Sequence, residues 1–78
     1  MAQIKLEQFR QIEKERNSIH EKVNATYTVF EKEGRKYVQI DTYGRDGRDI
    51  PEKISQSIQF DEEAARYLVR LLIKEYEL

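Results

Sequence analysis

Tyrosine and amide side chains alternate with apolar ones along residues 36–43, and such side chains can stack on nucleic-acid bases and hydrogen-bond to them. Successive side chains of a strand point to opposite sides, so the polar ones would share one face. The segment 54–60 repeats the alternation with serines and glutamines. With the basic residues near the strand ends, the candidate contacts are Lys36, Tyr37, Gln39, Tyr43, Arg45, Arg48, Lys53, Ser55 and Ser57. The alternative is an ordinary solvated face whose tyrosines pack across strands.

Residues for catalysis or metal binding form no recognisable set in this sequence. His20 is the single histidine, there is no cysteine, and no serine has a histidine in a known triad motif. Asp41, Asp46 and Asp49 are close in sequence, but their spacing does not match a calcium-binding loop. We therefore expect a non-enzymatic protein with no catalytic residue, no metal and no cofactor.

The composition limits the class of protein. The chain has 78 residues, and its 14 basic and 15 acidic side chains leave a formal net charge of −1. This balance argues against a strong non-specific polyanion binder, which would carry a basic excess. The sequence contains no apolar run long enough to span a membrane, so we expect a single, soluble, cytoplasmic domain.

The first part of the chain predicts a helix over residues 6–22, within an N-terminal segment 1–22. Its apolar residues recur at spacings of three, four and seven: Leu6, Phe9, Ile12, Ile19 and Val23. A helix of this length is marginal alone in water, so it must dock on the rest of the fold or on another chain. A packed surface helix is favoured over a coiled coil, because the repeat is short.

The middle of the chain, residues 23–60, predicts a three-stranded antiparallel meander. Strands are expected over 23–31, 36–43 and 54–60, by their period-two alternation. Gly34 suits a positive-φ position in the first hairpin turn, and residues 44–53 form a connecting loop.

The last part predicts a helix over residues 61–77, capped by Asp61. Its apolar residues spread over about 200° of the helical wheel, wider than one sheet face needs. We therefore expect an α+β fold, with this helix on one sheet face and a homodimer that covers the remainder. The expected surface for a second copy or another protein comprises Phe9, Ile12, Val69, Ile73 and Tyr76.

Two motifs resemble a known family. Residues 36–43 (KYVQIDTY), followed by a polar loop and residues 57–63 (SIQFDEE) entering a leucine-rich helix, are similar to the transcriptional positive cofactor four family and its small bacterial relatives. The resemblance covers about residues 24–76. It implies a curved antiparallel sheet backed by a helix, dimerisation through that helix, and single-stranded DNA bound by the sheet. The contacts it implies here are Lys36, Tyr37, Gln39, Tyr43, Lys53, Ser55 and Ser57.

Two functional hypotheses follow. In the first, the protein is a dimeric single-stranded nucleic-acid-binding protein and an accessory in transcription or DNA metabolism, in which tyrosines stack on bases and cations hold phosphates. In the second, it is a protein-interaction module, such as a small regulator or inhibitor of a larger enzyme. The near-neutral charge suits the second hypothesis.

Overall fold

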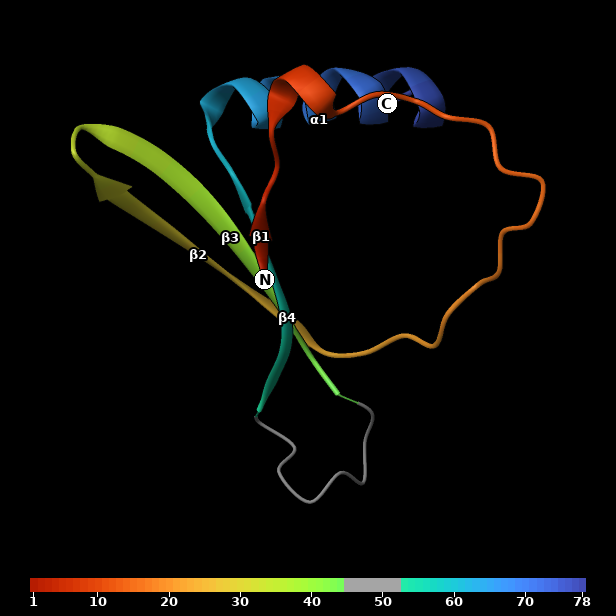
Figure 1. Ribbon diagram of the computed structural model, residues 1–78, viewed down its shortest axis with the longest axis horizontal. Coiled ribbons are helices and arrows are strands. Elements are labelled where there is room, and N and C mark those ends of the chain that lie inside the picture. The colour runs from red at the N-terminus through yellow and green to blue at the C-terminus, as the bar shows by residue number, and fades with distance from the viewer. Residues whose placement is uncertain (45–52) are drawn as a thin grey trace.

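The protein is an α+β fold with a four-stranded mixed sheet and one C-terminal helix (Figure 1). A computed structural model describes residues 1–44 and 53–78. Its elements, in chain order, are β1 (Ala2–Gln3), the short 3-10 helix η1 (Leu6–Gln8), β2 (Ala25–Lys32), β3 (Arg35–Tyr43), β4 (Ile54–Phe60) and α1 (Glu62–Tyr76). Residues 10–24 run outside any helix or strand and loop away from the sheet before they enter β2.

The strands lie in the order β1-β4-β3-β2. The strands β2, β3 and β4 form an antiparallel meander, in which Val38 of β3 lies between Val29 of β2 and Phe60 of β4. The strand β1 adds to the free edge of β4 in parallel, with Ala2 opposite Ile58. A register shift at Thr42/Tyr43 interrupts the pairing of β3 with β4.

The hairpin between β2 and β3 closes through a two-residue turn. Lys32 pairs with Arg35, and the two residues between them, Glu33 and Gly34, have φ angles of 54° and 78°. Positive φ at both central positions matches the right-handed twist of the flanking strands. The expectation of a positive φ at Gly34 is confirmed, and Glu33 adopts the same region at some steric cost.

The helix α1 begins as its sequence predicts. The Asp61 side chain accepts a hydrogen bond from the Ala64 backbone N–H at 2.9 Å, so one of the unpaired donors of the first turn is satisfied. Glu62 and Glu63 lie in the same turn, where the helix dipole favours carboxylates. The helix ends at Tyr76, and the next residue, Glu77, takes a left-handed conformation with φ of 55°.

The predicted N-terminal helix over 6–22 is wrong. Only Leu6–Gln8 form a helical turn, and the residues before it pair with the sheet instead: the Ile4 N–H donates to the Gln59 carbonyl at 2.9 Å. The amphipathic pattern needed a surface to dock on, because a helix of this length has little stability of its own. The rest of the chain offers no such surface to most of residues 6–22, and Ile12 and Ile19 are 62% and 102% exposed.

The predicted three-stranded antiparallel sheet is also wrong in its strand number, although β2, β3 and β4 pair as the expected antiparallel meander. The three predicted strands are present within two residues of their expected bounds, and Ile54–Phe60 matches as expected. The fourth strand has two residues, too few for any alternation to reveal it, and its parallel pairing makes the sheet mixed.

Little of the described chain is buried. Ala64 is fully buried and Asp41 is 6% exposed, whereas no large apolar side chain among the described residues is fully buried. The helix α1 contacts β4 and η1, where the rings of Phe9 and Tyr67 lie 5.3 Å apart. The apolar side of the sheet remains open, since Tyr27 is 74% exposed and Val29 55%.

Candidate nucleic-acid interface

One face of the sheet collects polar and aromatic side chains from β2, β3 and β4. The register places Thr28, Gln39 and Gln59 in one row across the three strands, and the rows on either side follow from the alternation of side chains. We call this surface the polar face. It comprises Thr26, Thr28, Phe30, Lys32, Arg35, Tyr37, Gln39, Asp41, Tyr43, Ser57 and Gln59.

Toward the β2–β3 turn, the polar face carries an aromatic pair. Phe30 and Tyr37 are cross-strand partners, and their rings are stacked with centroids 5.5 Å apart and planes inclined by 23°. Phe30 remains 36% exposed and Tyr37 is half-buried. The next pair toward the turn on this face consists of two basic residues, Lys32 and Arg35. A stacking platform and cations therefore lie within one row of each other.

In the middle of the polar face, side chains form a directed chain of hydrogen bonds. The Gln59 Nε2 donates to the Gln39 Oε1 at 2.7 Å, and the Gln39 Nε2 donates to the Asp41 Oδ1 at 2.9 Å. Ser57 donates its hydroxyl proton to the same Asp41 oxygen. Because the Asp41 carboxylate only accepts, it fixes the direction of every amide in the chain. Among the described residues no buried side-chain N or O atom lacks a partner.

Beyond Asp41, the hydroxyl of Tyr43 on β3 forms a hydrogen bond with the neighbouring strand β2. Its hydroxyl oxygen lies 2.9 Å from the Thr26 Oγ1, in a hydrogen bond that either hydroxyl can donate. The ring of Tyr43 is half-buried. Its position is thus set by the protein itself, so Tyr43 offers a pre-positioned ring and not a free one.

The structure separates the predicted contacts into groups. Tyr37, Gln39, Tyr43 and Ser57 share the polar face. Lys36 does not: it pairs with Glu31 on the opposite, apolar side, as the alternation along β3 requires.

Two further predicted contacts lie away from the centre of the polar face. Ser55 falls where the register between β3 and β4 shifts, and Lys53 is exposed just before β4. Arg45 and Arg48 lie outside the described residues.

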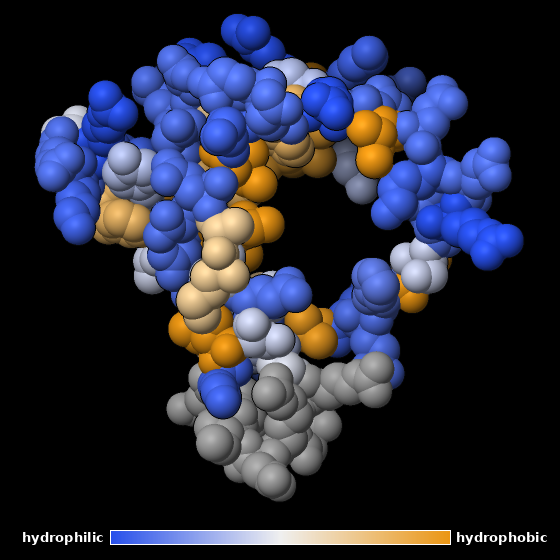
Figure 2. All heavy atoms as spheres, viewed as in Figure 1, coloured by the Kyte–Doolittle hydropathy of each residue, from blue (hydrophilic) through white to orange (hydrophobic). Residues whose placement is uncertain are grey.

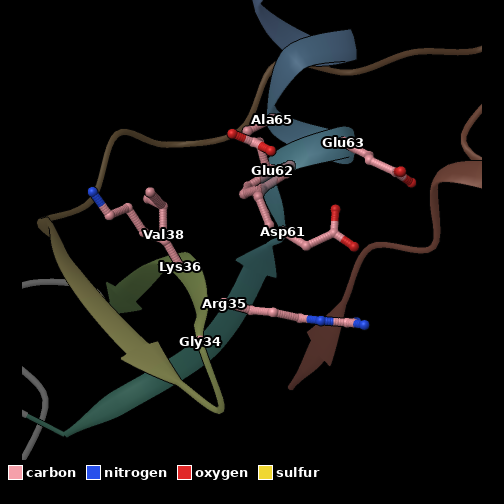
Figure 3. Close-up of a pocket in the computed structure, with 9 residues that line it drawn as sticks. Gly34, Arg35, Lys36, Val38, Asp61, Glu62, Glu63 and Ala65 are labelled. Carbon is pink, nitrogen blue, oxygen red and sulfur yellow. The ribbon is translucent and has the colours of Figure 1, made fainter.

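Figure 3 shows Arg35 and Lys36 pointing to opposite sides at the turn of the hairpin. Between this turn and the start of α1 is a hollow of about 570 Å³, also lined by Val38, Asp61 and Glu63. The hollow mixes two cations with carboxylates from the first turn of α1, so it has no strong excess of either charge.

Two features of the polar face were missed by the sequence analysis. The spacing of Asp41 from the loop aspartates indicates no calcium site and gives no sign of its role, which is that of the buried acceptor for the Gln39 amide and the Ser57 hydroxyl. Lys32 was not considered as a phosphate contact. The turn itself could have revealed Lys32: a two-residue turn at Glu33-Gly34 makes Lys32 the partner of Arg35 and Phe30 the partner of Tyr37.

In the described part of the chain, no group of three or more histidine, aspartate or glutamate side chains is arranged to hold a metal ion. The helices of that part are too short and too polar to cross a membrane. No family model matches the chain, and neither a curated protein nor a solved structure is similar enough to count as a match.

Proposed function

We propose that the protein binds single-stranded nucleic acid on the polar face of its sheet and has no catalytic activity. The observation that carries the proposal is the stacked, part-exposed pair of Phe30 and Tyr37 with Lys32 and Arg35 in the next row. Single-strand binders combine aromatic rings for the bases with cations for the backbone. This arrangement supplies both on one face.

The amide row gives the face a second kind of contact. Gln39 uses one N–H and its oxygen inside the hydrogen-bond chain, while Gln59, at the end of the chain, donates one N–H inward. The side-chain oxygen of Gln59 and the second N–H of its amide are not used in these bonds. They are therefore available to the edge of a base stacked nearby. Binding is expected to be weak to moderate, because the chain has a net charge of −1.

The adjacent residues Arg35 and Lys36 provide a matched test. Arg35→Glu and Lys36→Glu make the same change of charge one residue apart, but on opposite sides of the sheet. The measurement is fluorescence anisotropy of a labelled mixed-sequence single strand, at low and physiological salt, with duplex as the control. We expect Arg35→Glu to weaken binding and to lower the slope of log K against log salt by about 0.7, the value for one phosphate contact.

We expect Lys36→Glu to leave that slope unchanged. Equal losses for the two variants would mean that net charge alone, and not the polar face, controls binding. Absence of binding by the wild-type protein at low salt would refute the proposal.

A protein-interaction module is the second candidate function, and the exposed apolar side chains of the sheet and of α1 favour it. Of the residues expected for this role, Ile12 is exposed, whereas Phe9 packs on Tyr67 within the chain. Ile12→Asp is therefore the cleaner probe: a module that binds another protein through this segment loses its partner in a pull-down, and the oligonucleotide titration is unaffected.

A further inference from the structure

One row of the polar face consists of amide side chains and extends onto β1. The register pairs Gln39 with Gln59, and the parallel pairing of β1 with β4 places Gln3 opposite Gln59. Paired residues of neighbouring strands point to the same side of a sheet, so Gln3 lies on the polar face too. This side is opposite to that of Ile40 and Ile58; Figure 2 shows hydrophobic residues of the sheet region at the border of the opening through the molecule. We call Gln3, Gln59 and Gln39 the extended amide row.

The hydrogen bonds within this row leave a defined set of groups for a ligand. The Gln59 Nε2 donates to the Gln39 Oε1 at 2.7 Å, and the Gln39 Nε2 donates to the Asp41 Oδ1 at 2.9 Å. Since the carboxylate fixes this direction, the Gln59 oxygen and one of its N–H groups are not used in these bonds. Gln59 is half-buried, whereas Gln3 is exposed. Two amides, each with an acceptor oxygen and a donor N–H, therefore lie on neighbouring strands.

The spacing of these two amides matches one exocyclic amino group of a base. Neighbouring strands of a sheet lie about 4.8 Å apart. The two N–H bonds of an amino group diverge by about 120°, so two acceptors at about 2.9 Å from its nitrogen lie about 5.0 Å from each other. The side-chain oxygens of Gln59 and Gln3 can therefore accept both protons of the same amino group.

The atoms beside that amino group distinguish the bases. In adenine the N6 amino group lies between two acceptors, N1 and N7, so each amide can accept from N6 and donate to the ring nitrogen next to it. The amino group of cytosine has N3 on one side and a C–H on the other. The amino group of guanine lies beside N1–H, which is a donor, and thymine and uracil have no amino group. Among these bases, adenine alone complements both amides.

A base stacked on Tyr37 lies within reach of the two amides. Phe30 covers the face of the Tyr37 ring that is turned toward β2, with ring centroids 5.5 Å apart. The strand order leaves the other face of the ring toward β4. Gln59 is paired with Gln39, two residues along β3 from Tyr37. Such diagonal neighbours are about 7–8 Å apart, a separation that aromatic and long side chains span.

We propose that Gln59 and Gln3 bind the N6 amino group and the flanking ring nitrogens of one adenine, whose ring stacks on Tyr37. The protein therefore prefers single strands that contain adenine. This inference rests on the proposed binding of single strands and names the base that the polar face selects. It also gives a role to β1, which supplies one of the two amides.

The first test is competition anisotropy with oligodeoxythymidines that differ only in one central base: adenine, 7-deazaadenine, cytosine, guanine or thymine. The adenine strand should bind the wild-type protein about 20-fold more tightly than the all-thymidine strand, since each bidentate amide–adenine pair contributes about fivefold or more. The 7-deazaadenine strand, which has a C–H in place of N7, should bind several-fold less tightly than the adenine strand. Equal binding of all five strands overturns the inference and leaves single-strand binding intact. Absence of binding to every strand refutes the proposed function, and the inference with it.

The second test uses matched glutamine variants. Gln59→Met and Gln3→Met keep the length of the side chain and remove the amide, so each should lower the ratio of adenine-strand to all-thymidine affinity by about fivefold. Gln56→Met makes the same change on the opposite side of β4 and should leave the ratio unchanged. Circular dichroism checks that each variant is folded. A ratio that neither Gln59→Met nor Gln3→Met changes, or that Gln56→Met lowers equally, overturns the inference.

Discussion

The two faces of the sheet differ in how completely one chain satisfies them. On the polar face, Gln59, Gln39, Asp41 and Ser57 bond to one another and leave no buried polar atom unpaired among the described residues. On the opposite, apolar face, which includes Tyr27, Val29, Ile40 and Ile58, side chains such as Tyr27 and Val29 are more than half exposed.

The difference has a physical origin. Hydrogen bonds are short and directional, so neighbouring strands can satisfy them locally once the register is set. Apolar burial needs area, and α1, the one long helix among the described residues, contacts the sheet at β4, so the apolar side chains of β2 stay exposed. The polar contacts of a small domain can therefore be complete while much of its apolar surface stays exposed.

The largest loss of stability is expected from a charge on the apolar face. Ile40→Asp places a carboxylate among apolar side chains at the centre of that face, and we expect a loss of about 1–3 kcal/mol in unfolding free energy. Urea unfolding followed by circular dichroism measures it. Thr28→Asp is the control on the polar face and should cost much less; similar losses for both would remove the distinction between the faces.

Removal of the Asp41 carboxylate should disrupt the hydrogen bonds of the polar face. Asp41→Ala leaves the Ser57 hydroxyl and the Gln39 amide without their shared partner, and should reduce the unfolding free energy by about 1–3 kcal/mol. Asp41→Asn keeps an acceptor oxygen and should cost less. Denaturant unfolding of the three proteins checks the order, and a neutral Asp41→Ala would show that the hydrogen-bond chain contributes nothing to stability.

Nucleic-acid binding should depend on the polar face alone, so it distinguishes the two faces. Tyr37→Ala removes half of the stacked pair and should weaken single-strand binding by about 1–3 kcal/mol, the range for one stacked base. Tyr37→Phe keeps the ring and should bind nearly as the wild type does. Anisotropy titrations measure the affinities, and sedimentation should show the same mass for both variants. Unchanged affinity in Tyr37→Ala would exclude this pair as the stacking platform.

The smallest expected effect concerns the start of α1. Asp61→Ala removes the cap on the Ala64 N–H and should cost about 1 kcal/mol of stability. Thermal unfolding by circular dichroism detects this loss. Asp61→Ser, which retains a capping oxygen, should restore most of it. Single-strand affinity at a temperature where both variants are folded should stay unchanged, since Asp61 is not part of the polar face.

The second half of the fold could be predicted because its signals are local. Alternation located β4 at Ile54–Phe60, and Asp61 marked the start of α1. The prediction of an N-terminal helix was wrong because the apolar spacing of Leu6, Phe9 and Ile12 stabilises a helix only where another surface covers the apolar side chains. The strand β1 is defined by pairing with β4 and not by its own two residues.

The site was predictable to the level of a face, but not of a contact. Alternation along β3 grouped Tyr37 with Gln39 and would also have placed Lys36 on the other side. The stacking of Phe30 on Tyr37 and the bonds to Asp41 depend on the register between strands. That register follows from the two-residue turn at Glu33-Gly34, which the sequence suggested only as a short loop.

Native mass spectrometry of the wild-type protein with a short oligodeoxythymidine tests most directly whether the two faces of the sheet bind different partners. If the polar face binds the strand and the apolar residues form the homodimer expected from the sequence, the spectrum should show a dimer of the 9.4 kDa chain that carries oligonucleotide and stays dimeric as the ligand is added. An oligonucleotide bound to the monomer alone, or one that dissociates the dimer as it binds, would contradict two independent faces.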